Sequence, residues 1–514
     1  MISPEPKRIL AVLLLFLTTS CQQEDSGDAL ARQAYLDARA DTLATFIPCA
    51  RSANTPLAAL VVESRCSTYN VPENYDDPEG RHIDLRVMVI PSLTDLPLGD
   101  PLFLLAGGPG QAATDLLPIA QAFGRVRTER DIVLVDQRGT GELSPFDCQL
   151  DESEAEALQE QDPGFEEILA IQLEVLRECL DTMDADPANY TTDIAMRDLD
   201  AIRDWIGYPE INLWGASYGS RAALAYLQAY PGKTRAVIID AIAPPSLSLP
   251  LYNERDASAS LQQILDDCAA DTTCSTAFPD LAAHYTALIE HLQMPQPVSM
   301  LDDRDFSTVE TTIEAYEFFN FIRQILYSRE AQRLVPLIIE QAWQGNYRPV
   351  FALASQYAEA QINQGMFLSV ICNEDYTLLD ANLLAAEQGR DYLVESDLFN
   401  RLILEACAIW PGREVPVGYF EPVTADRPVL VFSGALDPVT PPVWGELVSA
   451  NLPNSQHLVL EGFGHGTVFT GCTISLMTDF IEAGSLAGLD TGCVGQFRRR
   501  PFFVTPGGSS LPHD

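Results

Sequence analysis

The chain has 514 residues, 47% of them hydrophobic and 9% aromatic, and its formal net charge at pH 7 is −42. This composition is typical of a globular protein, and the length predicts either one large domain with a substantial insertion or two domains. A surface this acidic repels phosphate backbones and anionic lipid headgroups, so we expect no nucleic-acid partner.

The first 20 residues have the pattern of an export signal. Lys7 and Arg8 precede the apolar run ILAVLLLFL, which is too short to span a bilayer and is followed by small polar residues. Cys21 resembles the lipidated cysteine of bacterial lipoproteins, although Thr18 stands where leucine is usual. We expect residues 1–20 to be a signal peptide. The mature protein is expected in the bacterial cell envelope, in the periplasm or outside the cell. We expect it to contact a membrane only through a lipid on Cys21.

The cysteine count agrees with export. Eleven cysteines leave ten once Cys21 is assigned to a lipid, and the simplest connectivity in an oxidising compartment pairs neighbours along the chain. The expected disulfides are Cys49 with Cys66, Cys148 with Cys179, Cys268 with Cys274, Cys372 with Cys407, and Cys472 with Cys493. The sequence has no CxxC pair and no cysteine–histidine cluster, so we expect neither a metal nor another cofactor.

Strand and helix patterns alternate through residues 21–245, the expected first part of a core. The runs IDLRVMVIPS, PLFLLAGGPG, DIVLVDQRGTGELS, INLW and TRAVIIDAIAP read as strands, and residues 191–207 have apolar positions at helical spacing. This alternation predicts an α/β fold with a mostly parallel central sheet and helices on both faces.

The alternation stops at about residue 246. Helical patterns such as VETTIEAYEFFNFIRQILY and RLVPLIIEQAWQ dominate residues 246–425, which we interpret as a helical cap inserted into the core. The sheet pattern returns over residues 426–485 with RPVLVFSGALDPVTPP and QHLVLEGFGHGT. Residues 486–514 are expected to be a tail, frayed after Cys493 because that part is rich in proline, glycine and serine. The sequence shows neither an internal repeat nor a transmembrane segment.

Ser217 lies in GASYGS, between Gly215 and Gly219, at the junction of a predicted strand and a predicted helix. A G-x-S-x-G motif in that context is typical of a nucleophile elbow, in which the serine hydroxyl stands above the sheet. Glycine and serine are common in any turn, so the motif alone does not decide the matter.

Two later residues complete a candidate triad with Ser217. Of the six histidines, His465 alone lies in a glycine-flanked loop just after a late strand, which suits a general base. Asp437 follows another buried strand; alone, an aspartate before proline is commonly a turn former. The order Ser217, Asp437, His465 is nevertheless that of α/β-hydrolases.

Acyl transfer also needs hydrogen-bond donors for an oxyanion. We expect one from the backbone N–H of Tyr218, which follows the candidate nucleophile. The other is expected from the N–H of Gly108, in the glycine-rich loop after an early strand.

Together the motifs AGGPG, DQRGTGELS, GASYGS, SGALDPVTP and GFGHG resemble the prolyl iminopeptidase and tripeptidyl aminopeptidase branch of the α/β-hydrolases. The resemblance covers most of the mature chain and is weakest in the cap. It implies a serine exopeptidase that needs no metal and releases single residues or short peptides from substrates with a free N-terminus. The chain departs from the iminopeptidase motif at Ala106, where histidine is usual.

Exopeptidases of this kind need an acidic anchor for the substrate's N-terminal ammonium, and we expect Glu374, or else Asp375, to supply it. Both lie in SVICNEDY, beside Cys372, near the end of the predicted cap. The alternative for either acid is a solvated acidic turn.

Two other functions remain open. The first is an esterase or lipase of the same fold, which would lack the acidic anchor. The second is a catalytically inactive envelope binding protein, against which the complete set of triad and oxyanion motifs argues.

Overall fold

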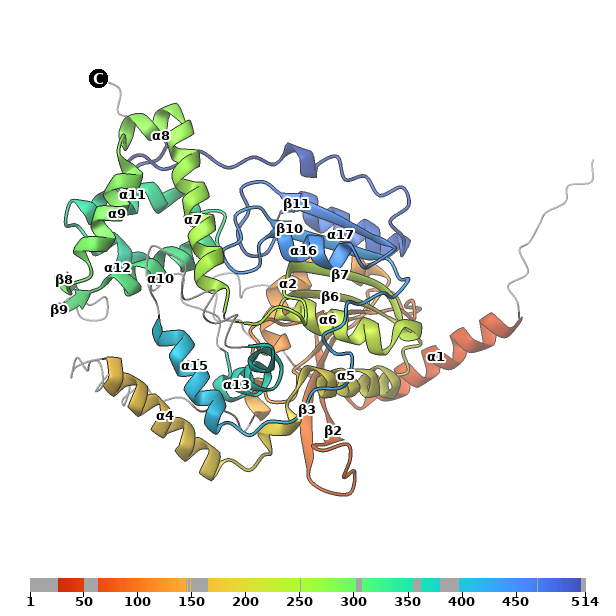
Figure 1. Ribbon diagram of the computed structural model, residues 1–514. Coiled ribbons are helices and arrows are strands. Elements are labelled where there is room, and N and C mark those ends of the chain that lie inside the picture. The colour runs from red at the N-terminus through yellow and green to blue at the C-terminus, as the bar shows by residue number, and fades with distance from the viewer. Residues whose placement is uncertain are drawn as a thin grey trace, which may run out of the picture.

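The computed structural model describes residues 26–49, 63–144, 146, 148, 165–249, 251–301, 307–354, 362–379, 397–468 and 470–509 (Figure 1). The expected signal peptide and Cys21 lie outside these residues. Within them, we find no helix with the length and apolar character that a membrane crossing requires.

A central sheet with strand order β1-β2-β3-β5-β4-β6-β7-β10-β11 organises the molecule. One edge is antiparallel and consists of β1 (Ile47–Pro48), β2 (Arg65–Pro72) and β3 (His82–Ile90). The other strands are parallel: β4 (Leu102–Leu105), β5 (Ile132–Val135), β6 (Ile211–Ser217), β7 (Thr234–Ile242), β10 (Val429–Gly434) and β11 (Ser455–Leu460). The predicted α/β fold with a mostly parallel sheet is confirmed.

Helices cover both faces of the sheet, which explains why the central strands are continuously apolar. On one face lie α1 (Ser26–Ala44), α5 (Thr192–Ile206), α6 (Tyr218–Ala229) and α16 (Pro442–Ser449). On the other lie α2 (Leu117–Ala122) and α17 (Gly471–Ala483). Successive residues of β6 show the division, because Leu213 packs into the first cluster and Trp214 into the second.

Between β7 and β10 the chain leaves the sheet and builds further layers. A separate core joins α7 (Asn253–Ala270), α8 (Thr272–Ala277), α9 (Leu281–His291), α10 (Ala315–Leu326), α11 (Val335–Trp343) and α12 (Arg348–Ala354), grouped on one side in Figure 1. A second layer contains α13 (Gln364–Val370), the π-helical turn η7 (Ile371–Asp375) and α15 (Asp397–Ile409). Helix α4 (Phe165–Thr182), which precedes β6 in sequence, also packs in this second layer.

The interpretation of residues 309–327 as one helical segment is wrong at its start. Residues Thr308–Ile313 form strand β9, which pairs with β8 (Gln296–Leu301). The β-branched residues of TVETTI favour a strand, and α10 begins only after Glu314, which forms a capping box with Glu317.

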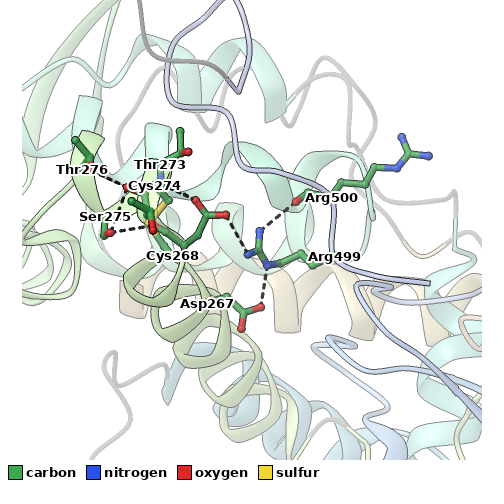
Figure 2. Close-up of a disulfide and its surroundings, with 10 residues drawn as sticks. Asp267, Cys268, Thr273, Cys274, Ser275, Thr276, Arg499 and Arg500 are labelled. Atoms are coloured by element: carbon green, nitrogen blue, oxygen red, sulfur yellow. Dashed lines mark hydrogen bonds and ion pairs between the residues drawn. A yellow bond between two sulfur atoms is a disulfide. The ribbon is translucent and has the colours of Figure 1, made fainter. Parts of the chain in front are cut away.

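The predicted frayed tail is also wrong over residues 494–509. Phe502 and Val504 are buried in the core of α7–α12, and the N–H of Phe503 donates to the carbonyl of Arg333 at 2.9 Å. The guanidinium of Arg499 binds Asp267 on α7 at 3.0 Å, as Figure 2 shows. The tail is ordered because its arginines and aromatic residues find acidic and apolar partners on these helices.

All five expected disulfides are present, and their Cα–Cα distances lie between 5.0 and 6.2 Å. The bond between Cys268 and Cys274 joins α7 to α8 (Figure 2). Five disulfides indicate that the protein folds in an oxidising compartment outside the cytoplasm.

The lipid anchor is testable by intact-mass analysis of protein isolated from its native membrane fraction. We expect an acylated Cys21 as the first residue, and no reaction with a thiol reagent before reduction because the other ten cysteines are paired. Reduction should expose ten thiols. A Cys21→Ser variant is the control and should be recovered without acyl mass; an unmodified or different N-terminus in the wild type would contradict the anchor.

Candidate active site

Ser217 occupies a sharp turn between β6 and α6. Its φ of 57° and ψ of −129° lie in a region that residues with a side chain rarely adopt. The flanking glycines are required by close approach. A Cβ on Gly215 would overlap the carbonyl oxygen of Gly219, and a Cβ on Gly219 would overlap that of Leu105. The local sequence therefore produces the strand–turn–helix geometry that was expected of a nucleophile elbow.

Asp437 and His465 meet beyond the carboxyl ends of β10 and β11. The Nδ1 atom of His465 lies 2.9 Å from Oδ2 and 3.0 Å from Oδ1 of Asp437. The carboxylate also accepts bonds from the N–H groups of Val439 and Thr440, both at 2.9 Å, and from the Thr440 hydroxyl at 2.9 Å. Asp437 is therefore a fixed acceptor that orients the imidazole.

Electrostatics strengthens this pair. Burial opposes ionisation of Asp437, but the charge of His465 and the surrounding donors hold the pKa of Asp437 below its usual value. Burial likewise opposes protonation of His465, but the charge of Asp437 outweighs it and raises the pKa of His465. The arrangement stabilises the imidazolium that forms when His465 accepts a proton.

The insertion contacts His465 through Tyr327, the residue that follows α10. Its backbone N–H donates to the carbonyl of Tyr327 at 3.0 Å, and the two rings are 4.8 Å apart. Tyr327 follows α10 and was missed by sequence reasoning. No local signal could have linked it to a residue 138 positions later (465−327).

The glycine-rich loop lies against the elbow, as expected of an oxyanion loop. A Cβ on Gly107 would sit 3.4 Å from the Cβ of Ser217. The carbonyl of Gly110 accepts from the N–H of Asn363 at 3.0 Å, which joins the loop to the start of α13. Tyr218 opens α6, so its N–H belongs to the first turn of that helix. Oxyanion binding by Tyr218 and Gly108 stays a prediction.

Glu374 and Asp375 do not lie as expected. Both are fully buried, and protein groups bind both carboxylates. Asp375 accepts two bonds from Arg221, at 2.8 and 2.9 Å, and one from the N–H of Leu249 at 2.7 Å. Glu374 accepts from the N–H and hydroxyl of Thr192 at 2.7 and 2.9 Å, and from the Tyr419 hydroxyl.

The prediction that either acid faces a substrate cleft is therefore wrong for this structure. Burial raises the pKa of both carboxyls, since one guanidinium offsets only part of the cost of burying two carboxylates. Arg221 lies on α6, four residues after Ser217, and Glu374 and Asp375 lie on η7. The acids join α6 to the insertion, a pairing across 153 and 154 positions that the sequence did not reveal.

Among the residues that the structure describes, no group of three histidine, cysteine, aspartate or glutamate side chains is arranged to hold a metal ion. The side chains placed at the carboxyl ends of β6, β10 and β11 are a serine, an imidazole and a carboxylate.

Comparisons with known proteins agree with this geometry. The profile of the alpha/beta hydrolase fold family matches residues 100–471. Serine protease Hip1 of Mycobacterium tuberculosis is 25% identical over 475 residues, which cover 86% of this chain and 89% of that protein. Carboxylesterase B of the same organism is 26% identical over 460 residues, covering 84% and 86%. Tripeptidyl aminopeptidase of Streptomyces coelicolor is 28% identical over 193 residues, covering 35% and 36%.

Proposed function

The chain belongs to the alpha/beta hydrolase fold family, and from this premise we propose that it is a serine aminopeptidase that cleaves peptide bonds near a free N-terminus. The observation that carries the catalytic part is the contact of His465 with the buried Asp437 at 2.9 Å, at the sheet edge where the elbow holds Ser217. Relatives named serine protease and tripeptidyl aminopeptidase support the choice of a peptide substrate.

The reaction follows from the roles of the three residues. His465 takes the proton of the Ser217 hydroxyl as its oxygen attacks the scissile carbonyl, and Asp437 stabilises the resulting imidazolium. The N–H groups of Tyr218 and Gly108 bind the oxyanion of the tetrahedral intermediate. His465 then protonates the leaving amine, which leaves an acyl-enzyme on Ser217. Water activated by His465 releases the N-terminal fragment and restores the serine.

We assign residues 246–425 the role of a cap that selects substrates. Contacts of Tyr327 with His465, and of Asn363 with the glycine-rich loop, support this assignment because both lie in that segment and touch the candidate machinery.

An esterase is the second candidate, and two observations favour it. A relative over most of the chain is named carboxylesterase B. The acids expected to anchor a substrate ammonium are also buried against Arg221. A peptidase of this chain must therefore recognise the ammonium with other groups.

A matched set of substrates separates the two candidates. We expect the kcat/KM of a short peptide amide with a free N-terminus to exceed that of its N-acetylated form at least about tenfold, a difference of about 1.4 kcal/mol. An aryl ester of similar size reports on the catalytic residues without the ammonium. Equal rates on free and acetylated peptides would contradict the aminopeptidase. Hydrolysis of the ester alone would establish the esterase instead.

A further inference from the structure

We propose that Asp240 is a second acid of the active site, which positions the His465 loop through Thr467 and stabilises the protonated imidazole with its negative charge. This inference rests on the proposed role of His465 as the catalytic base. It assigns a positioning and electrostatic role to a residue outside the predicted triad.

Asp240 lies near the carboxyl end of a central strand of the sheet, beside the strands that carry the candidate site. It is in β7, the strand between β6, which ends in Ser217, and β10, which leads into Asp437. Its register partners are Ala216, next to the nucleophile, and Phe432 on β10. The side chain is fully buried. A carboxylate is an unusual residue for such a strand because burying its charge is costly.

The hydrogen bonds of Asp240 lead to the catalytic histidine. Its Oδ2 accepts from the N–H of Thr467 at 2.7 Å and from the Thr467 hydroxyl at 3.0 Å. Thr467 is two residues after His465, and its carbonyl accepts in turn from the Thr473 hydroxyl on α17 at 2.7 Å. Asp240 thereby orders the backbone just after His465, and the N–H of His465 itself donates to the Tyr327 carbonyl.

A purely structural acceptor would not need to be a carboxylate. The second oxygen of Asp240, Oδ1, is buried without a hydrogen-bond partner among the described residues. An asparagine could accept both Thr467 bonds through its single oxygen, without the penalty of a buried, partly unsatisfied anion. The hydrogen bonds to Thr467 therefore do not explain why this residue carries a negative charge.

That charge acts on His465. The charged groups that influence the imidazole are Asp437 after β10, Asp240 on β7 and Arg323 on α10, and the two carboxylates outweigh the arginine. The phenol of Tyr327 also faces the ring. Burial raises the pKa of Asp240 to about 6, with the Thr467 bonds and the His465 charge opposing that rise. Asp240 is thus ionised at neutral pH, and its support for the imidazolium fades as the pH falls through about 6.

The test is Asp240→Asn, which keeps an oxygen for Thr467 and removes the charge. The readout is the pH dependence of the rate at which an aryl phosphonate labels Ser217, a reaction that needs His465 as base but no peptide recognition. Without the nearby anion, His465 loses its proton at lower pH. On the acidic side of the profile (the acid limb), we expect the pH of half-maximal labelling rate to fall by about 0.5 to 1 pH unit. The maximal labelling rate should fall a few-fold because the base is weaker.

Asp136→Asn is a matched control. Asp136 is also buried, its pKa is also raised to about 6, and it also accepts from the N–H and hydroxyl of one threonine, Thr114, at 2.8 and 3.1 Å. It follows β5, on the far side of β4 from the nucleophile strand, so its loss should leave the acid limb unchanged.

Thr467→Ala is a second variant in case Asp240→Asn does not fold. Loss of the hydroxyl donor raises the pKa of Asp240, so the acid limb should move in the same direction by a smaller amount. An unmoved limb in the folded variants, or an equal movement in Asp136→Asn, would overturn the role of Asp240 while leaving the triad in place. Wild-type protein that Ser217-directed reagents do not label would overturn both the triad and this inference.

Discussion

Ser217→Ala is expected to lower kcat for any accepted substrate by about 10⁴-fold or more, with the folded structure retained. The loss is this large because the hydroxyl oxygen forms the covalent intermediate and no neighbouring group can replace it. The elbow should persist, since its geometry depends on Gly215 and Gly219 and on the packing of α6, and alanine removes only one oxygen atom. Turnover and thermal unfolding of the purified variant measure the two effects separately.

His465→Ala should reduce turnover almost as much as Ser217→Ala, and the double variant little further, because the members of a triad act as a unit. Ser485→Ala, in the turn after α17, is the control and should retain wild-type rates. Turnover above about one hundredth of wild type in Ser217→Ala would remove this serine from the mechanism.

Arg221→Met is expected to destabilise the protein by about 3–5 kcal/mol, because it leaves two buried carboxylates without their counter-charge. Methionine fills much of the volume of the arginine stem, so the loss reports mainly on charge. Arg221, Glu374 and Asp375 are completely buried, and the guanidinium also donates to the carbonyl of Leu247 at 2.9 Å. Denaturant unfolding with the disulfides intact measures the change.

Two further variants identify the cause of that loss. Arg401→Met removes a pair with the exposed Glu166, at 2.9 and 3.3 Å, and should lower stability far less than Arg221→Met does. Adding Glu374→Gln and Asp375→Asn to Arg221→Met should recover much of the lost stability, since the unpaired charges are gone. If the triple variant is no more stable than Arg221→Met, lost packing rather than buried charge explains the effect.

The core of the fold and the strand–turn–helix geometry at Ser217 were predictable because each depends on short-range information. The apolar runs of β4, β5 and β10 need no distant partner to be read as buried strands, and Gly215 and Gly219 encode the elbow locally. The disulfides were predictable because the pairs are neighbours along the chain.

What was missed depends on partners that are distant in sequence. SVICNEDY reads as an acidic, accessible stretch until Arg221 is placed beside it, and the charge pattern of one segment cannot reveal a neutralising group about 150 positions away. Tyr327 and Asp240 were missed for the same reason. In the tail, composition suggested fraying, but Phe502 and Val504 enter a core built from α7–α12.

The ordered tail also changes the mechanics of substrate access. An inserted layer that is joined to a sheet by few connecting segments can rotate about them as a rigid body. Here the residues after Cys493 form a further connection, because Cys493 is bonded to Cys472 on α17 and Phe502 is buried in the core of α7–α12. Figure 1 shows this segment running from α17 to that layer. This further connection opposes rotation of the α7–α12 layer as a rigid body. Ser217 is itself only partly buried, so a substrate can reach it without rotation of that layer.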